Sequence, residues 1–224
     1  MVAPLIVALD VDSAQRAVDL AAELEPHVAG FKVGLGLLAR VGPGLIERVA
    51  AAGKPVFVDV KLHDIPVQVQ RAATEYGRHG ARWITAHASG GAAMLGAAVE
   101  GLASTSPDGG VLAVTVLTSL DDAAIEAVGI EPPVGDLVAS MAAVADRTGC
   151  EGAVCSTHEI SMVRAVAPRL ISVVPGIRPQ PSDDDQARTA TPDEATMAGA
   201  DYLVVGRPIT GAADPAAAAA AIAR

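Results

Sequence analysis

Aromatic residues are scarce in this chain of 224 residues, since one tryptophan, two tyrosines and two phenylalanines make up only 2% of it. Proteins that bind single-stranded nucleic acid stack the bases on aromatic side chains, so this scarcity argues against such a surface. Basic residues are also in the minority: the formal net charge is −10, and lysine and arginine form no basic block. A nucleic-acid surface is therefore disfavoured, while a small, locally positive phosphate pocket remains compatible with the acidic total.

Cysteine and long apolar runs are also lacking. Four residues separate Cys150 from Cys155, which fits neither a Cys-x-x-Cys redox motif nor a four-ligand zinc site, so both are interpreted as buried or half-buried thiols. No apolar run approaches the roughly 18–20 residues of a membrane span. The start, residues 1–5, lacks the basic region of a signal peptide. A soluble, cytoplasmic protein is expected.

Short apolar runs do occur, and they alternate about eight times with longer segments of helical period. The predicted strands are Leu5–Leu9, Gly30–Val33, Val56–Lys61, Trp83–Ala86, Val111–Val116, Gly152–Cys155, Ile171–Val174 and Tyr202–Val205. The predicted helices are Ala14–Glu25, Leu37–Ala51, Val67–His79, Ala92–Leu102, Val134–Thr148, His158–Ala165, Pro192–Ala198 and a last one after Asp214-Pro215. Such alternation predicts parallel βαβ units with right-handed crossovers.

Eight units in this length predict an α/β fold, a (β/α)8 TIM barrel formed as a single domain over residues 1–224. A doubly wound open sheet is the alternative. It is disfavoured because Asp10-Val11-Asp12-Ser13 stands where a dinucleotide-binding sheet carries Gly-x-Gly-x-x-Gly. In a barrel, the chemistry belongs at the carboxyl ends of the strands. Polar residues follow most of the apolar runs there, namely Asp10, Lys32, Asp59, Lys61, Asp64, His87, Thr118, Ser119, Arg178 and Arg207.

The third strand carries the densest group of charges. Asp59 and Lys61 point to the same side because side chains alternate along a strand. Buried charges normally persist only when they are paired or used. Asp64 is expected as a helix N-cap, because Ile65-Pro66 is typical of a first helical turn. The same residues are also compatible with a structural ion pair and a simple cap.

Lys32, Asp59, Lys61 and Asp64 are expected to alternate in sign around the barrel mouth. Each charge then has an opposite neighbour, which keeps the lysines protonated and the aspartates ionised. A lysine held as an acid suits proton delivery to a carbanion and does not suit Schiff-base formation. Metal binding through Asp10, Asp59, Asp64 and His87 is the less favoured alternative, because the lysines would compete with a cation.

Two glycine-containing turns predict a phosphate cradle. Pro175-Gly176-Ile177-Arg178 and Gly206-Arg207-Pro208 follow the seventh and eighth strands, where barrels commonly hold phosphate on backbone N–H groups. Arg207 would add a charge-assisted contact. The long polar connection over residues 180–188 suits a mobile lid with Gln180 at its base. Alternatively, these glycines serve only tight turns.

The motifs at the strand ends resemble those of the bacterial orotidine 5′-phosphate decarboxylases, and they occur in the order of that family. The matching stretches are Ile6–Asp10, Phe31–Gly34, Asp59–Pro66, His87–Gly91, Val116–Ser119, Pro175–Gln180 and Gly206–Thr210. The specific one is Asp-x-Lys-x-x-Asp-Ile-Pro, since related sugar-phosphate enzymes share its first part but typically lack Ile-Pro.

The resemblance implies decarboxylation of orotidine 5′-monophosphate to uridine 5′-monophosphate in pyrimidine biosynthesis, without a cofactor or metal. It implies that Lys61 protonates the ring carbon, that Asp59 lies against the departing carboxylate, and that Lys32 holds Asp59 and the ribose. It further implies a homodimer in which Asp64 reaches the partner's site. Substrate binding is expected from Asp10 at the ribose, Ser119 at the pyrimidine, Gln180 and Arg207 at the phosphate, and from Thr118, Arg178 and Gly206.

Two positions depart from the family pattern. Val67-Gln68 stands where the family usually has Asn-Thr, and Pro181 replaces a glycine, which would stiffen the lid. Two alternatives for the function remain. A sugar-phosphate decarboxylase or aldolase of the same superfamily is disfavoured by Ile65-Pro66 and Ser119, and an inactive nucleotide-binding barrel is disfavoured by the intact set of charges.

Overall fold

The computed structural model describes residues 2–131, 133–179 and 189–223, and its centre is a closed barrel of parallel strands. The strands are β1 (Leu5–Ala8), β2 (Gly30–Gly34), β3 (Val56–Leu62), β4 (Trp83–His87), β5 (Gly110–Val114), β6 (Gly152–Val154), β7 (Ile171–Val174) and β8 (Tyr202–Val205). Each strand pairs with the next along the chain, and β8 pairs with β1 to close the ring. The predicted (β/α)8 barrel is confirmed.

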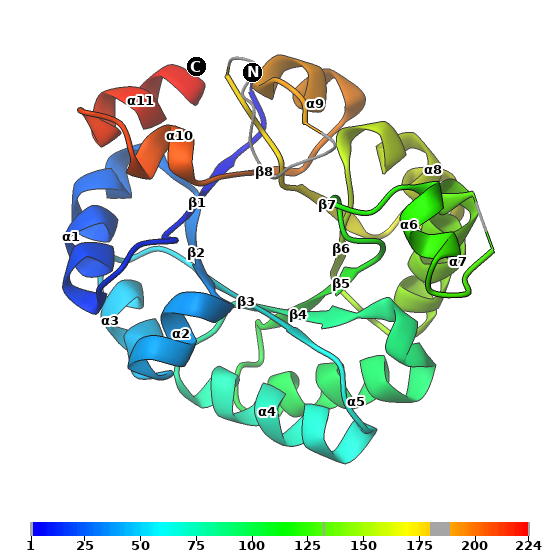
Figure 1. Ribbon diagram of the computed structural model, residues 1–224. Helices are drawn as coiled ribbons and strands as arrows, with labels where there is room; N and C mark the ends of the chain where they lie inside the picture. Colours follow the sequence, from blue (N-terminus) through cyan, green and yellow to red (C-terminus); the bar gives the residue numbers. More distant parts are fainter. Residues whose placement is uncertain (1, 132, 180–188, 224) are drawn as a thin grey trace.

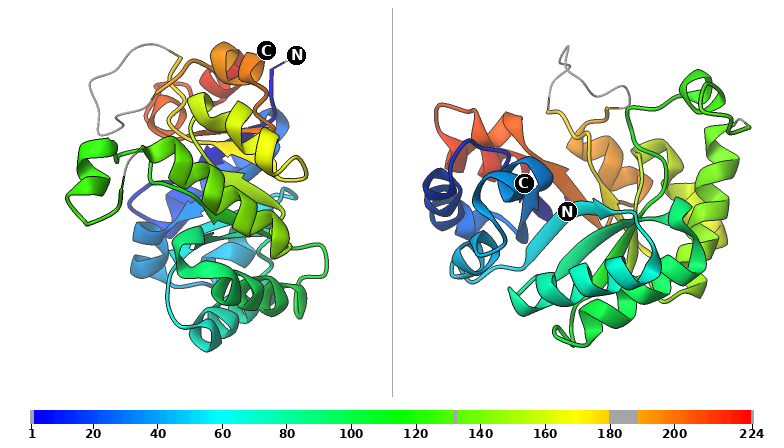
Figure 2. Two further views of the ribbon diagram at one scale, coloured as in Figure 1. Left: turned by 90° about the vertical axis from the view of Figure 1, so that its right-hand side faces the viewer. Right: turned by 60° about the horizontal axis from the view of Figure 1, so that its bottom comes forward.

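Helices cover the outside of the barrel on all sides, as Figures 1 and 2 show. The α-helices are α1 (Ala14–Leu24), α2 (Leu35–Val41), α3 (Leu45–Ala50), α4 (Pro66–Arg78), α5 (Gly91–Ala103), α6 (Asp122–Glu126), α7 (Val134–Arg147), α8 (Ile160–Val166), α9 (Pro192–Ala198), α10 (Arg207–Thr210) and α11 (Pro215–Ile222). Short 3-10 helices are η1 (Glu25–His27), η2 (Ala88–Gly90) and η3 (Thr157–Glu159).

One predicted helix is wrong, because its span contains two helices. The span Leu37–Ala51 forms two helices, α2 and α3, with a break at Gly42. Gly42 has a φ of 79°, a left-handed conformation that glycine adopts without a steric penalty, and its N–H closes α2 on the carbonyl of Leu38. The short helices α6 and α10 were not predicted, whereas β7 and β8 have the predicted bounds.

Side-chain alternation along the strands separates two apolar layers. In β1, Ile6 and Ala8 belong to a small cluster inside the barrel, whereas Leu5 and Val7 belong to the large core between strands and helices. The rest of the buried inner cluster comes from other strands, namely Phe57, Trp83, Leu112, Val173 and Val204. Both faces of the strands are therefore buried, which explains their continuous apolar sequences.

A polar and aromatic group closes the amino end of the barrel. Arg82 makes two hydrogen bonds of 2.6 Å with the carboxylate of Glu151, and the indole N–H of Trp83 donates to the same carboxylate at 3.1 Å. Tyr202 meets the Trp83 ring edge-on, with ring centroids 5.3 Å apart. This end is filled with side chains, so the space for a ligand lies at the carboxyl end.

The remaining predictions about composition concern thiols and membrane spans. Cys150 and Cys155 are both free and buried, as predicted, and burial raises the pKa of the Cys150 thiol to about 11. Among the described residues, no helix has both the length and the apolar character needed to cross a bilayer.

Candidate active site

A cavity of about 470 Å³ opens at the carboxyl ends of the strands. Its walls come from all strands except β4, either from the strand itself or from the loop that follows it. The lining residues are Ala8, Asp10, Lys32, Phe57, Asp59, Lys61, Val114, Val116, Leu117, Thr118, Ser119, Val154, Val173, Pro175, Gly176, Arg178, Val204, Gly206 and Arg207. Most of the site residues predicted from the sequence are therefore brought together around one space.

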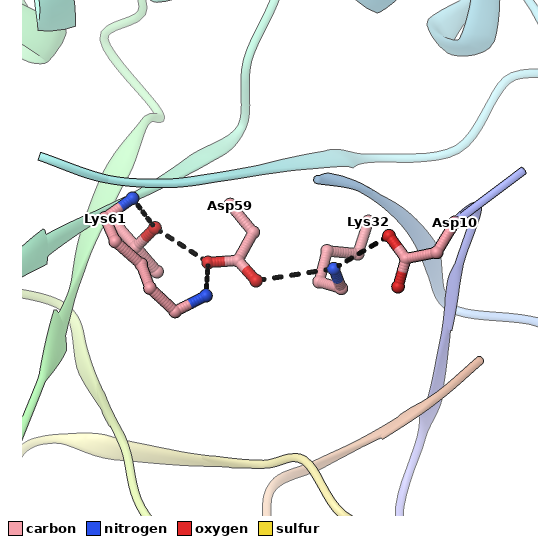
Figure 3. A network of polar contacts seen from close by, with 5 residues as sticks. Asp10, Lys32, Asp59 and Lys61 are labelled. Atoms are coloured by element: carbon pink, nitrogen blue, oxygen red, sulfur yellow. Dashed lines mark hydrogen bonds and ion pairs between the residues drawn. The ribbon is translucent and has the colours of Figure 1, made fainter. Parts of the chain in front are cut away.

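Four charged side chains of alternating sign lie in a row across the ends of β1, β2 and β3, as Figure 3 shows. Asp10 Oδ1 lies 3.4 Å from Lys32 Nζ, and Lys32 Nζ lies 3.3 Å from Asp59 Oδ2. On its other oxygen, Asp59 Oδ1 accepts a hydrogen bond of 2.8 Å from Lys61 Nζ. We call Asp10, Lys32, Asp59 and Lys61 the ion-pair row. Lys32 lies between two carboxylates, and Lys61, at the end of the row, is held by Asp59.

Asp59 is the most enclosed carboxylate of this row, with a side chain only 13% exposed. Burial by itself raises the pKa of a carboxyl group, because the charged form loses its hydration. The two neighbouring lysines, together with hydrogen bonds from Lys61 and Thr85, outweigh that effect and hold the pKa of Asp59 below its ordinary value of 3.8. Asp59 is thus a fixed negative charge throughout the neutral pH range.

Strand β3 departs from regular geometry at this row. Val58 pairs with Ile84 and Leu62 pairs with Ala86, so the three residues 59–61 lie opposite Thr85 alone. Within this bulge Lys61 has a φ of 48°, and among the described residues it is the one non-glycine residue with a positive φ. A left-handed backbone costs an ordinary residue about 1–2 kcal/mol. Strain of this kind is often found at functional sites.

Asp64 lies in the turn between β3 and α4, and two predictions about its place differ from the structure. Asp64 is exposed, lies outside the cavity lining and forms no ion pair with any described residue. It is not the N-cap of α4 either: Ile65 is, and Asp64 Oδ1 instead accepts from the Ile65 N–H at 2.6 Å. The fourth member of the row is instead Asp10, which lies beside Lys32, at the opposite end from the place expected for Asp64.

The cavity has a charged half and an apolar half. Strands β1 to β3 supply the ion-pair row, whereas β5 to β8 each contribute one valine, namely Val114, Val154, Val173 and Val204. Thr118 and Ser119, from the loop after β5, add hydroxyl groups beside the apolar half. A ligand held here meets the ion-pair row on one side and the four valines on the other, with Arg178 and Arg207 after β7 and β8.

The predicted phosphate residues line the same cavity. Gly206 is the N-cap of α10 and Arg207 is its first residue, while Arg178 follows β7 and is buried. Gln180, Pro181 and the proposed lid fall in residues 180–188, outside the described part of the chain. The charged lining residues are Lys32, Lys61, Arg178 and Arg207 against Asp10 and Asp59. The cavity therefore has a formal excess of two positive charges in a chain of net charge −10, which suits an anion.

His87 does not line the cavity, contrary to its predicted place at the mouth. Its ring lies 5.3 Å from the ring of His63. Burial, followed by the proximity of His63 and Lys61, lowers the pKa of His87 below 6.5, so its imidazole is neutral at pH 7. In the described part of the chain, no three His, Cys, Asp or Glu side chains form a group that could hold a metal ion.

Sequence reasoning missed two residues of this site. Thr85 hydrogen-bonds with the bulge of β3, and Gly34 lies next to the ion pair between Asp10 and Lys32. A signal existed for Thr85, which is a polar residue within the apolar run Trp83–His87 and is fully buried. For Gly34 the sequence gave no comparable signal, because its close neighbours come from the ends of two different strands.

Replacement of Lys32 by methionine tests the electrostatics of the ion-pair row. The substitution removes the largest influence that lowers the pKa of Asp59 and leaves burial, which raises it, in place. We expect the pKa of Asp59 to rise, measured by the carboxyl carbon-13 shift of Asp59 against pH. Lys54→Met is the matched control, since Lys54 pairs with Glu25 on the outer surface. An unchanged Asp59 titration in Lys32→Met would contradict the proposed electrostatics.

Comparisons with known proteins agree with this geometry. The protein-family model described as "Orotidine 5'-phosphate decarboxylase / HUMPS family" matches residues 3–222. A relative from Thermobifida fusca (strain YX), named orotidine 5'-phosphate decarboxylase, is 48% identical over 226 residues, which cover 100% of this chain and 95% of the relative. A relative of the same name from Anaeromyxobacter sp. (strain K) is 50% identical over 221 residues, 98% of this chain and 96% of its own.

A solved structure supports the same assignment. The crystal structure of orotidine 5'-phosphate decarboxylase from Lactobacillus acidophilus is 36% identical and superimposes with a TM-score of 0.86, covering 98% of this chain and 97% of that one. These matches confirm the predicted enzyme class, a carboxy-lyase, and none of them supports a sugar-phosphate enzyme or an inactive barrel. The chain belongs to the orotidine 5'-phosphate decarboxylase family.

Proposed function

We propose that this protein converts orotidine 5′-monophosphate to uridine 5′-monophosphate and carbon dioxide, with Lys61 as the proton donor and residues 1–224 as one catalytic domain. The observation that carries the proposal is the ion-pair row at the mouth of a positively charged cavity. The substrate carries a phosphate and a carboxylate, which match the cationic excess of the cavity. The predicted cytoplasmic location stays a prediction.

The reaction needs one proton and a stabilised carbanion. The bond between the pyrimidine ring and its carboxylate breaks, carbon dioxide leaves, and the electron pair stays on the ring carbon. The ammonium of Lys61 stabilises this developing negative charge and then transfers a proton to the carbon. Solvent returns the proton to Lys61. Asp59, placed 2.8 Å from Lys61 Nζ, orients the ammonium and lies near the departing carboxylate.

The rest of the site holds the parts of the substrate that do not react. Arg178, Gly206 and Arg207 line the cavity and would hold the phosphate. The phosphate contact expected of Gln180 stays a prediction, because that residue lies outside the described part of the chain. Lys32 and Asp10 lie toward the ribose hydroxyls, and Thr118 and Ser119 toward the pyrimidine edge. Binding energy from the phosphate and ribose fixes the ring against the ion-pair row, so contacts remote from the reacting carbon contribute to the rate.

We also propose that the protein acts as a homodimer in which Asp64 completes the partner's site. Asp64 is exposed, and the apolar side chains that follow it in the chain are exposed as well, namely Ile65, 60%, and Val67, 45%. Leu35, at the start of α2, is 63% exposed. These residues follow the neighbouring strands β2 and β3 at the catalytic end. Covering them with a second copy buries apolar surface and brings Asp64 toward another cavity.

Lys61→Ala tests the proton-donor role. The spectral change from orotidine to uridine monophosphate is followed by ultraviolet absorbance, with a chelator present to exclude adventitious metal. We expect turnover to fall by about 10⁴-fold or more, because both the acid and its charge are lost. Binding of uridine monophosphate, measured by calorimetry, should be largely kept. Lys54→Ala on the outer surface is the control and should match the parent. Turnover by Lys61→Ala near the parent rate would show that another group donates the proton.

Gly34→Ala tests the spacing of the ion-pair row. A Cβ at Gly34 would lie 2.8 Å from Asp10 Oδ1 and 3.2 Å from Lys32 Nζ, so these two side chains would have to move. A displacement of about 1 Å in a catalytic group can reduce the rate about 100-fold. We expect kcat/KM to fall by about tenfold or more. Gly36→Ala is the matched control, because a Cβ there meets nothing within 4 Å. Equal activity of the two variants would show that the row tolerates this displacement.

Mixing inactive variants tests the shared site. In a heterodimer of Lys61→Ala and Asp64→Asn chains, one of the two sites keeps its own Lys61 and receives an intact Asp64 from the other chain. Random pairing should therefore restore about one quarter of the parent activity. Lys61→Ala mixed with Asp59→Asn is the control and should restore none, since both residues act within one chain. Absence of recovery in the first mixture, with heterodimers demonstrated by two affinity tags, would place Asp64 outside the partner's site.

A further inference from the structure

The bulge of β3 rests on one side chain of the neighbouring strand. Residues 59–61 lie opposite Thr85 alone, and this side chain is fully buried. The backbone N–H of Lys61 donates to Thr85 Oγ1 at 2.9 Å, and Thr85 Oγ1 donates to Asp59 Oδ1 at 3.0 Å. One hydroxyl group thus contacts both the backbone of the lysine and the carboxylate that holds its ammonium.

The directions of these two hydrogen bonds follow from the groups involved. A backbone N–H can only donate, and the ionised carboxylate of Asp59 can only accept. The Thr85 hydroxyl must therefore accept from Lys61 and give its single proton to Asp59. The two partners therefore fix the direction of the Thr85 O–H bond, and neither hydrogen bond can form in the opposite direction.

A hydroxyl in this place removes two costs of the bulge. The Lys61 N–H is partly buried, and without the Thr85 hydroxyl it would lose its acceptor. The left-handed φ of Lys61, 48°, persists only when surrounding contacts hold it. The same hydroxyl aligns Asp59 Oδ1, which also accepts from Lys61 Nζ at 2.8 Å. Thr85 Oγ1 therefore positions both ends of Lys61. It accepts directly from the backbone N–H, and it orients the ammonium through Asp59 Oδ1.

We propose that Thr85 is a positioning residue for catalysis: its hydroxyl fixes the strained backbone of Lys61 and the Asp59 carboxylate together, and so sets where the ammonium lies in the cavity. Thr85 does not line the cavity and touches no substrate, so it acts only through Asp59 and Lys61. This inference deepens the proposed function and rests on it for the role of Lys61.

Thr85→Val and Thr85→Ser separate the hydroxyl from the shape of the side chain. Valine keeps the volume and removes both hydrogen bonds, whereas serine keeps the hydroxyl. Thr115→Val is the matched control: Thr115 is also a buried threonine, 3% exposed, but its hydroxyl donates to the carbonyl of Val154 at 3.0 Å and not to a member of the ion-pair row. Should Thr85→Val fail to fold, Thr85→Ala compared with Thr115→Ala makes the same test.

We expect kcat of Thr85→Val to fall by about tenfold to 100-fold, since a misplaced catalytic group loses that much. KM should stay within about threefold of the parent, because the substrate contacts are kept. Thr85→Ser should recover most of the lost rate, and Thr115→Val should show the parent kcat. A kcat for Thr85→Val within twofold of the parent, a Thr85→Ser as slow as Thr85→Val, or an equal loss in Thr115→Val would overturn the inference.

Two readouts need no substrate and keep this inference distinct from the proposed function. In Thr85→Val, carbon-13 titration should show a higher pKa for Asp59, because one hydrogen bond to its charged form is gone. The Lys61 amide should exchange with solvent faster than in the parent. If the parent fails to decarboxylate the nucleotide, the proposed function fails, while these measurements still decide the role of Thr85. An unchanged Asp59 titration together with an unchanged Lys61 exchange would contradict it.

Discussion

Burial of the Asp59 carboxylate is the constraint on which the site depends. An isolated carboxylate in this position would become protonated, because a buried charge without a partner is unstable. Lys32 and Lys61 flank it on its two oxygens, and Thr85 adds a neutral donor. The two lysines thus stabilise the charge of the buried carboxylate, and the carboxylate is itself part of the bulge of β3. The proton delivery proposed for Lys61 depends on this mutual arrangement, since an ammonium so held has a fixed position before any ligand arrives.

The barrel separates the tasks of stability and chemistry between its ends. At the amino end, Arg82, Trp83 and Glu151 satisfy one another and fill the interior. At the carboxyl end the side chains of the strands leave a cavity, and it is lined by charged residues from the strand ends and the loops that follow them. Strain is placed accordingly, because the left-handed backbone of Lys61 lies at the carboxyl end.

The fold could be predicted from the sequence because its signal is local and repeated. Apolar runs such as Ile171–Val174 carry their own evidence for being strands. The break at Gly42 was missed because the helical period continues on both sides of it. The bulge of β3 was missed for a different reason. It involves a hydrogen bond between Lys61 and Thr85, a residue 24 positions further along the chain, and no local pattern contains that contact. Any contribution of Asp64 to a second chain is likewise invisible in the pattern of one.

The ion-pair row and the valine wall of the cavity come from different parts of the sequence. The ion-pair row lies between residues 10 and 61, whereas the valines of the wall and the two arginines lie between residues 114 and 207. The proposed acid chemistry and the proposed ribose contacts are thus encoded in the first third of the chain, and the contacts proposed for the phosphate and the pyrimidine are encoded in the second half. Mutations in the second half can consequently alter the latter contacts without replacing a residue of the ion-pair row. A barrel built in this way is free to diversify its ligands while it retains one kind of chemistry.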